Sequence, residues 1–234
     1  GFHGVASSWG RPENARVKHL HKCFTDFLAA CRDRKLPLDF FSFHCYDYAE
    51  FAAKQIAYCR KTLDAYGFKD TEMSLNEWLP DPEHKDLGTA KQAASIAAEL
   101  VALQHGPVVD AEIYDARCGV GAYSPLFNCL TYKPHKAYYV FKAFNALRQL
   151  GMSVKVTDSA DMCDGKGLWI TAATDGKDRK AVLVANISDG PLPLPAVLRD
   201  GAFKVRAIDA THDYDEISCP ESIGKDTVLL FKRQ

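Results

Sequence analysis

Short apolar segments recur along the first 150 residues at a nearly constant spacing. They lie near residues 4–7, 38–44, 73–77 and 108–114. Their approximate centres, Val5, Phe41, Leu75 and Glu112, are separated by 36, 34 and 37 residues. This separation is typical of a strand–helix–strand unit, in which a buried strand is followed by a crossover helix. The spacing therefore predicts parallel βα units in series.

The intervals between these segments have the periodicity of amphipathic helices. Apolar residues recur at steps of three and four within residues 17–31, 52–66, 90–101 and 137–147. Gly67 and Gly151 follow two of these stretches as stop signals, and Pro134 opens the last one. Residues 1–150 are therefore predicted to form four βα units with right-handed crossovers.

The remaining residues, 151–234, have the pattern of an antiparallel β domain. Short segments rich in strand-forming residues lie at 153–156, 168–174, 181–187, 203–208 and 227–231. Asp-Gly pairs at 175–176, 189–190 and 200–201 mark turns between them. Because no helical period of useful length occurs here, we expect a small sandwich-like domain that packs against the helical layer.

The composition excludes several classes of partner. The 234 residues include 29 basic and 30 acidic side chains, giving a formal charge of -1. That balance argues against nucleic acid or an anionic membrane surface, since both attract strongly basic proteins. Apolar residues make up 47% and charged residues 25%, as in ordinary globular proteins. No run of 18 apolar residues occurs, so no membrane span is expected, and the localisation stays open.

Cysteine and histidine spacing gives no metal or redox motif. The eight cysteines include no CxxC pair, and we expect buried free thiols in preference to disulfides. His19 and Cys23 share a helix face near His21, but a structural zinc site needs four ligands. Neither GxGxxG nor a P-loop follows any predicted strand. We therefore expect no metal and no cofactor.

Polar and aromatic side chains follow three of the predicted strands, where parallel α/β proteins place their reactive residues. These residues are His44 and Tyr46 after the second strand, Glu77 and Trp78 after the third, and Tyr114, Asp115 and Arg117 after the fourth. Aromatic rings stack on the C–H faces of sugar rings, and carboxylates act at the anomeric carbon. The pattern therefore indicates carbohydrate chemistry.

Several of these segments resemble the glycoside hydrolases of family 39, retaining enzymes built on (β/α)8 barrels. The resemblance is carried by residues 38–46 (LDFFSFHCY), 74–78 (SLNEW), 114–117 (YDAR), 123–127 (YSPLF), 133–134 (KP) and 138–139 (YY). Residues 4–9 (GVASSW) are similar to the region of the fifth barrel strand. The order and spacing of the segments extend the resemblance over essentially the whole chain, including the β domain.

The resemblance implies a role for individual residues. Glu77 would be the nucleophile that forms a covalent glycosyl-enzyme intermediate. Tyr46 would hydrogen-bond that carboxylate and keep it ionised, while His44 would contact substrate hydroxyls or the proton donor. Tyr114 or Trp78 would help to wall the sugar subsite.

Each of these residues also has a purely structural interpretation. Glu77 could be a buried, ion-paired carboxylate at a strand end, although the three converging strands favour the catalytic role. His44 and Tyr46 could be a polar pair within the core. For Asp115 and Arg117, an internal salt bridge is favoured over substrate binding. Trp9 is a weaker candidate for a sugar platform than for packing.

The usual proton donor of the family has no counterpart in the chain. A retaining enzyme needs a second carboxylate about 5–5.5 Å from the nucleophile. In the family this group lies on the fourth barrel strand, in an NE motif, and that strand would precede residue 1. A complete barrel also takes about 250 residues. The resemblance thus implies half of a (β/α)8 barrel, residues 1–150, followed by a β domain, residues 151–234.

A half barrel has open strand edges and an uncovered inner face, both of which favour association. A two-fold homodimer would close eight strands and bring Asp115 of the partner subunit towards the place of the absent proton donor. Two function classes follow. One is a retaining hydrolase, whole or truncated, that acts on β-linked xylose- or glucose-like sugars by double displacement. The other is a catalytically incomplete, carbohydrate-binding or structural half barrel that assembles as a homo-oligomer.

Overall fold

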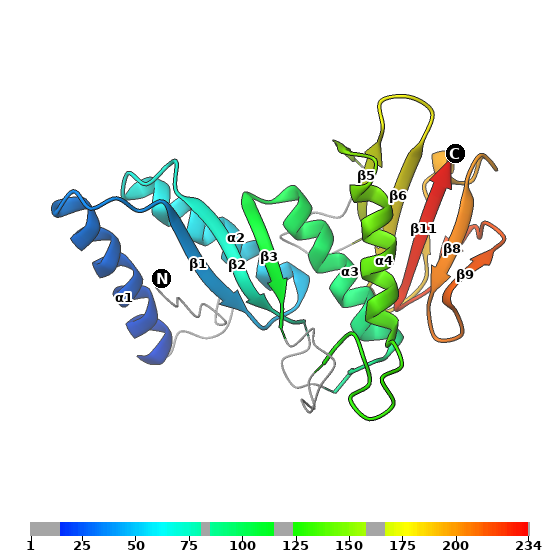
Figure 1. The fold of residues 1–234 in the computed structure, drawn as a ribbon, viewed down its shortest axis with the longest axis horizontal. Coiled ribbons are helices and arrows are strands. Elements are labelled where there is room, and N and C mark those ends of the chain that lie inside the picture. Colours follow the sequence, from blue (N-terminus) through cyan, green and yellow to red (C-terminus); the bar gives the residue numbers. More distant parts are fainter. Residues whose placement is uncertain (1–14, 81–84, 115–123, 158–166, 234) are drawn as a thin grey trace.

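The computed structural model describes residues 15–80, 85–114, 124–157 and 167–233. Helices and strands alternate in the N-terminal part: α1 (Ala15–Asp33), β1 (Phe40–Cys45), α2 (Ala49–Ala65), β2 (Glu72–Trp78), α3 (Ala90–His105), β3 (Val108–Ile113) and α4 (Lys136–Arg148). Strands β1, β2 and β3 form a parallel sheet in this order (Figure 1). The predicted parallel βα series is confirmed for these strands; the strand expected at residues 4–7 lies outside the described residues.

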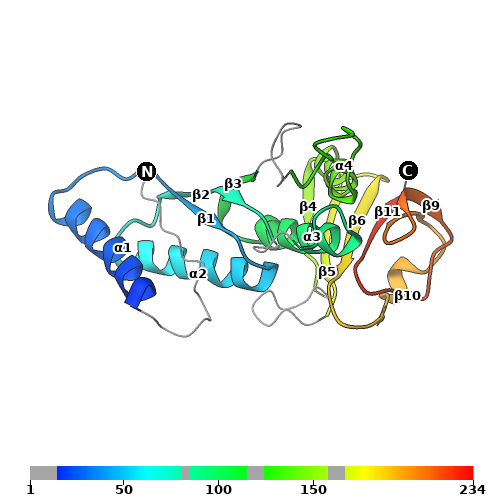
Figure 2. The ribbon, with the colours of Figure 1, turned by 90° about the horizontal axis from the view of Figure 1, so that it is seen from below.

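The parallel sheet is covered on one face. Alternate side chains of β1 and β2 are buried towards the helices, namely Phe41, Phe43, Cys45, Met73 and Leu75. Helices α1 and α2 lie on this side of the sheet, as Figure 2 shows. Of the intervening residues, which point the other way, His44 and Ser74 are only partly buried, whereas Ser42 is 7% exposed. This alternation, in place of a continuous apolar run, is typical of a sheet with one covered face.

The C-terminal part is antiparallel, as predicted. A six-stranded sheet has the order β4-β5-β6-β11-β8-β9. Its strands are β4 (Met152–Val154), β5 (Trp169–Thr174), β6 (Lys180–Asn186), β8 (Lys204–Ile208), β9 (Asp213–Ile217) and β11 (Thr227–Arg233). Strands β7 (Leu192–Pro193) and β10 (Ser222–Ile223) pair with each other, and a short 3-10 helix spans Ala196–Leu198. Helix α4 is followed by a turn in which Gly151 adopts a φ of +87°, and β4 begins at the next residue.

Both faces of the six-stranded sheet are buried. Trp169, Leu183 and Leu230 on one face belong to the same core as the helices. The other face forms a second buried cluster with the β7–β10 layer, which includes Ile170, Val184, Leu194, Leu198, Ile223 and Phe231. The β domain is therefore layered like a sandwich, with helices against one face and short strands against the other.

Helix α3 joins the two sheets. It contacts α2 and α4 as well as β5, β6 and β11, and residues 92–103 are all buried. Its six alanines favour the helix and let neighbouring elements approach closely on every side. The helix begins after Thr89, whose hydroxyl accepts a hydrogen bond from the Gln92 N–H at 3.3 Å. One continuous core thus extends from the parallel sheet through α3 into the antiparallel sheet.

Within the described ranges, no helix is both long enough and apolar enough to cross a membrane. The cysteines at positions 23, 31, 45, 59, 129 and 219 are free thiols, whereas Cys118 and Cys163 lie outside the described residues.

Candidate functional site

A β-bulge near the carboxyl end of β2 determines how Glu77 is presented. Phe43 of β1 pairs with Leu75, but the next residue, His44, pairs with Glu77, so that Asn76 is an extra residue in β2. Leu75 is buried towards the helices, whereas Glu77 comes to lie beside His44 on the other face. Bulges of this kind redirect a side chain and recur next to active sites. The bulge therefore brings the carboxylate of Glu77 to the face of the sheet that no described helix covers, which we call the open face.

His44 and Glu77 form the centre of the candidate site. His44 Nε2 lies 3.7 Å from Glu77 Oε2, and the two side chains are 15% and 30% exposed. This distance suits an ion pair with a protonated histidine and exceeds that of an ordinary hydrogen bond. The backbone of His44 is anchored from behind, since Gln55 Nε2 of α2 donates to its carbonyl oxygen at 2.9 Å. The carboxylate is thus oriented by the histidine and still accessible to a ligand.

Two tyrosines lie at the same end of the sheet. Tyr46 follows β1 and Tyr114 follows β3, and their rings meet edge-on with centroids 5.7 Å apart. The Tyr46 ring also contacts the His44 ring edge-on at 6.1 Å. Tyr114 is held by its backbone N–H, which donates to the Trp78 carbonyl at 2.8 Å. Since β2 lies between β1 and β3, the tyrosine pair spans the end of the strand that carries Glu77.

The geometry differs from the expected roles in two respects. The described contacts include no hydrogen bond between Tyr46 and Glu77; instead Tyr46 contacts His44, which contacts the carboxylate. Trp78 is 1% exposed and packs near Phe141 of α4, with ring centroids 6.4 Å apart. The bulge turns Glu77 to the open face and leaves Trp78 facing the helices. Of the two residues expected to wall a subsite, the structure therefore places Tyr114 at the site and Trp78 in the core.

Asp115, Arg117 and Trp9 lie outside the described residues. Within the described residues, no three His, Cys, Asp or Glu side chains are grouped so that they could hold a metal ion.

A second group of titratable residues, which the sequence analysis missed, lies behind the site. Glu99 of α3 is 0% exposed, and Asp47, which follows Tyr46, is 4% exposed. Burial, and then the charge of Asp47, raises the pKa of the Glu99 carboxyl well above its usual range. Burial also raises the pKa of the Cys45 thiol, with further contributions from Glu99 and Asp47. A glutamate within an alanine-rich apolar helix was the available sequence signal, since buried acids are rare.

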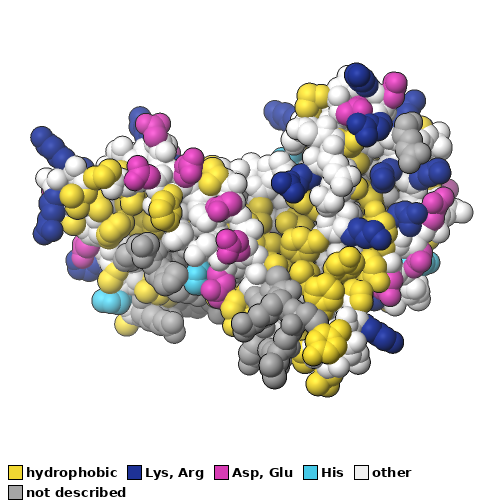
Figure 3. Space-filling model, in the orientation of Figure 1, with side chains coloured by type: hydrophobic (Ala, Val, Ile, Leu, Met, Phe, Trp, Pro, Cys, Tyr) yellow, Lys and Arg dark blue, Asp and Glu magenta, His cyan; other side chains and the backbone are white. Residues whose placement is uncertain are grey.

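The open face of the sheet is acidic. Asp110 and Glu112 of β3 are exposed. Figure 3 shows acidic side chains over β2 and β3, whereas Lys and Arg on this face gather mainly over the β domain. The candidate site therefore lies at the carboxyl end of an acidic strip.

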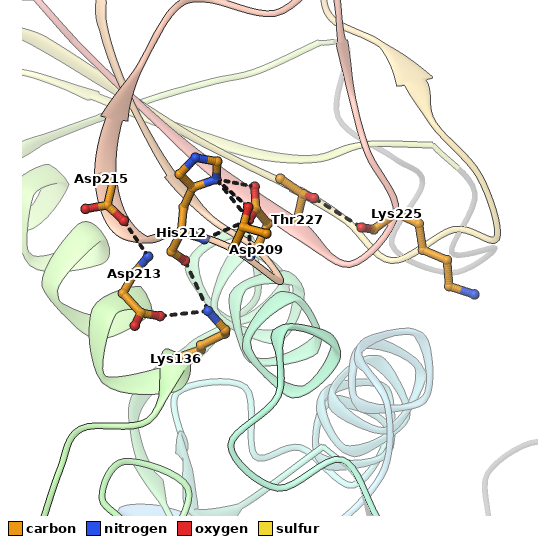
Figure 4. Close-up of polar contacts among 8 residues, drawn as sticks. Lys136, Asp209, His212, Asp213, Asp215, Lys225 and Thr227 are labelled. Atoms are coloured by element: carbon orange, nitrogen blue, oxygen red, sulfur yellow. Dashed lines mark hydrogen bonds and ion pairs between the residues drawn. The ribbon is translucent and has the colours of Figure 1, made fainter.

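A separate polar network fastens the β domain to the N-terminus of α4 (Figure 4). Lys136 Nζ contacts Asp213 Oδ1 at 2.7 Å and donates to the His212 carbonyl at 3.3 Å. Partial burial acts to raise the pKa of Asp209, but hydrogen bonds from His212 and Thr211 outweigh it and lower this pKa. These contacts hold the β8–β9 turn against the helix, which makes them structural.

Comparison with known proteins gives structural neighbours only. No family model and no curated protein sequence matches the chain. A glucosidase from Croceicoccus marinus superimposes with a TM-score of 0.65 and 18% identity, over 88% of this chain and 56% of that one. A GH39 β-xylosidase from Caulobacter crescentus gives 0.60 and 16%, over 90% and 54%. A GH39 enzyme from Xanthomonas axonopodis pv. citri gives 0.61 and 14%, over 89% and 57%.

These neighbours confirm the fold that the sequence resemblance implies. The fold of the chain is similar to that of these three enzymes, and the chain spans little more than half the length of each. At such low identity the likeness concerns the fold alone.

Proposed function

We propose that this chain is the nucleophile-bearing half of a retaining glycoside hydrolase that acts on β-linked xylose- or glucose-like sugars. The observation that carries the proposal is the placement of Glu77, 3.7 Å from His44 on the open face and at the carboxyl end of parallel strands. Active sites of barrel enzymes lie at this end of their strands. A xylosidase and a glucosidase among the structural neighbours support the choice of sugar class.

The proposed chemistry is a double displacement. Glu77 attacks the anomeric carbon and forms a covalent glycosyl-enzyme, which water then hydrolyses. His44 orients the carboxylate through the contact at 3.7 Å. Tyr46 and Tyr114 offer aromatic surface against which the C–H face of a sugar ring packs. In this assignment residues 1–150 form the barrel half that holds the site, and residues 151–234 form the β domain behind it.

Glu77→Gln tests the nucleophile assignment, because an amide keeps the shape of the side chain but does not form the glycosyl ester. We expect turnover of a nitrophenyl β-xyloside or β-glucoside to fall at least about 1,000-fold, of the order of the contribution of a catalytic nucleophile. Glu72→Gln is a matched control, since Glu72 is an exposed residue at the opposite end of β2. Unchanged turnover in Glu77→Gln would exclude the assignment.

A second candidate function is favoured by the open sheet. Strand β3 pairs with β2 alone among the described strands, and Val109 and Phe40 are 61% and 57% exposed. Such an edge and face favour association, so a carbohydrate-binding or structural half barrel that forms a homodimer is the alternative. Sedimentation equilibrium at micromolar concentration tests the assembly, and a compact monomer would contradict the dimer. Sugar binding without turnover would favour this alternative over hydrolysis.

A further inference from the structure

A pocket in the β domain lies on the face of the six-stranded sheet opposite to α3 and α4. Its volume is about 430 Å³, within the range of about 300–1,000 Å³ that small-molecule sites occupy. Its lining residues come from β4, β5, β6 and β11 and from the segment between β7 and β8. The pocket is therefore separate from the candidate site, which lies at the carboxyl ends of β1, β2 and β3.

The register of the strands gives the pocket an apolar floor. Val154 pairs with Ala172, and Ala172 pairs with Val182 on the next strand. Val182 in turn pairs with Phe231, which is buried in the cluster on the side of β7 and β10. Paired residues of adjacent strands point to the same face. The floor therefore faces away from the helices, and Val154 at its edge is 40% exposed.

The segment between β7 and β8 forms a wall beside this floor. Val197 of the 3-10 helix lines the pocket and is 66% exposed. Phe203 also lines it and stands edge-on to Phe231, with ring centroids 6.1 Å apart, so its ring is held against the sheet. An aliphatic floor and an aromatic wall favour a ligand with an apolar body, because binding removes apolar surface from water.

Two cationic side chains lie next to each other at one end of the floor. Lys180 of β6 and Arg233 of β11 are directly paired across the strands, and both line the pocket. The ion pairs found in the described β domain join other residues, so neither cation has an acidic partner there. Like charges directly opposite each other destabilise a sheet. An anion bound between Lys180 and Arg233 would relieve this repulsion.

The lining also contains the carboxylate of Asp200. Its Oδ1 accepts a hydrogen bond from the Ala202 N–H at 2.9 Å, so this acid is engaged by the backbone of its own turn. The lining thus has two positive charges against one negative charge. Charge complementarity therefore favours an anionic group at the end of the pocket that Lys180 and Arg233 form.

We propose that this pocket binds an aromatic carboxylate, with the ring on the apolar floor beside Phe203 and the carboxylate between Lys180 and Arg233. A carboxylate accepts charge-assisted hydrogen bonds from an ammonium group, and a guanidinium group binds both of its oxygens. The aromatic ring packs against aliphatic side chains and pairs with a second ring. This site stands apart from the proposed function, since it uses no residue of the parallel sheet.

Titration of the whole chain with 3-phenylpropanoate, followed through backbone amide signals in NMR spectra, tests the proposal. We expect saturable shifts centred on residues 172–174, 180–182 and 233, with a Kd in the millimolar range of small ligands in open pockets. Absence of saturable shifts at these residues would overturn the site.

Two further ligands separate the contributions of charge and ring. The neutral 3-phenylpropanamide has the same shape and should bind at least about 5-fold more weakly, because it gains no ion pair. Acetate carries the charge without the ring and should give no saturable shifts over the same concentrations. Equal binding of the amide would overturn the role of the two cations, and equal binding of acetate would overturn that of the apolar floor.

Arg233→Gln tests the charged end of the pocket. Affinity for 3-phenylpropanoate should fall at least about 5-fold. The unfolding temperature should stay unchanged or rise, since the substitution removes a like-charge pair. A purely structural role would lower the unfolding temperature instead and would contradict the proposal.

Lys204→Gln is the matched control. Lys204 and Lys232 are also directly paired cations, on β8 and β11. Because Lys232 precedes Arg233 in the strand, this pair points to the opposite face of the sheet. The control should bind 3-phenylpropanoate with wild-type affinity. An equal loss of affinity in Lys204→Gln and Arg233→Gln would indicate an effect of net charge and would overturn the site.

Discussion

The buried carboxyl group of Glu99 makes the stability of this protein depend on pH in a defined direction. Its side chain is 0% exposed, and neither oxygen has a hydrogen-bond partner among the described residues. Burial and the charge of Asp47 raise its pKa well above the usual range. The folded state therefore retains a proton that the unfolded chain releases, since an unfolded glutamate has a pKa of about 4.3. Stability must then fall as pH rises above that value.

The dependence of the unfolding free energy on pH follows from the difference in bound protons between the folded and unfolded states. One extra proton bound by the folded state lowers the free energy of unfolding by about 1.4 kcal/mol per pH unit, from the unfolded pKa up to the raised pKa. Below about pH 4 both states are protonated and this loss disappears. Even the neutral carboxyl carries a cost, because a buried polar group without a partner destabilises the fold by about 1–3 kcal/mol.

Glu99→Met removes both effects while keeping a side chain of similar length. At pH 5 the unpartnered polar group costs about 1–3 kcal/mol and the linkage adds about 1 kcal/mol, so we expect the free energy of unfolding of the variant to exceed that of the wild type by about 2–4 kcal/mol. This difference should widen by about 1.4 kcal/mol for each pH unit towards pH 8, while the raised pKa has not been passed. Urea unfolding followed by tryptophan fluorescence at pH 5, 6, 7 and 8 measures both quantities.

The matched control is Gln104→Met, an exposed position on the same helix that carries no titratable group. Its difference from the wild type should be small and independent of pH. Parallel pH profiles for Glu99→Met and the wild type would refute the reasoning, and so would a variant less stable than the wild type at pH 8.

Three further substitutions test the β domain. Gly176 and Gly201 both have a φ of +76°, so an alanine at either position should lower stability by about 1–2 kcal/mol in thermal unfolding. A Cβ at position 176 would lie 2.5 Å from Met152 Cε, but that atom ends a flexible, exposed side chain that can move away, so the two losses should be similar. Asn186 is 0% exposed, and its Nδ2 donates to three backbone carbonyls. Asn186→Ala should therefore lower the free energy of unfolding by about 2–4 kcal/mol. A loss below about 1 kcal/mol in urea unfolding would contradict that role.

The architecture was predictable because burial imposes periodicity on the chain. Alternation in β1 and β2, with Phe41, Phe43 and Leu75 towards the helices, marks strands covered on one face. The steps of three and four in α2 and α4 mark helices that pack along one side. In the β domain, the predicted strands correspond to β4, β5, β6, β8 and β11. These signals are local, so sequence spacing alone locates them.

Elements with little buried apolar surface escaped prediction. Strand β9 (Asp213–Ile217, DYDEI) is an edge strand with mostly exposed side chains, and its pattern is polar. Strands β7 and β10 contain two residues each and exist only through their pairing with each other. Such elements depend on contacts between distant parts of the chain, which a single sequence does not reveal.

The candidate site also depends partly on local sequence signals and partly on contacts between distant parts of the chain. The strand ends that carry His44, Tyr46, Glu77 and Tyr114 could be found from the sequence. The bulge at Asn76 could not, because it is a property of pairing with both neighbours. Without the bulge, strict alternation from the buried Leu75 would place Trp78 on the open face and Glu77 towards the helices. The register of the sheet therefore decides which of these side chains reaches the site.

His44 and Glu77 are held from the covered side of the sheet. Gln55 of α2 anchors the His44 carbonyl, and Leu75 and Trp78 flank the bulge within the core. That core continues through α3, which the antiparallel sheet buries on its far side. Among the described residues, contacts behind the strands thus hold His44 and Glu77 in place. For the proposed hydrolase, this support would arrange the carboxylate before a sugar binds.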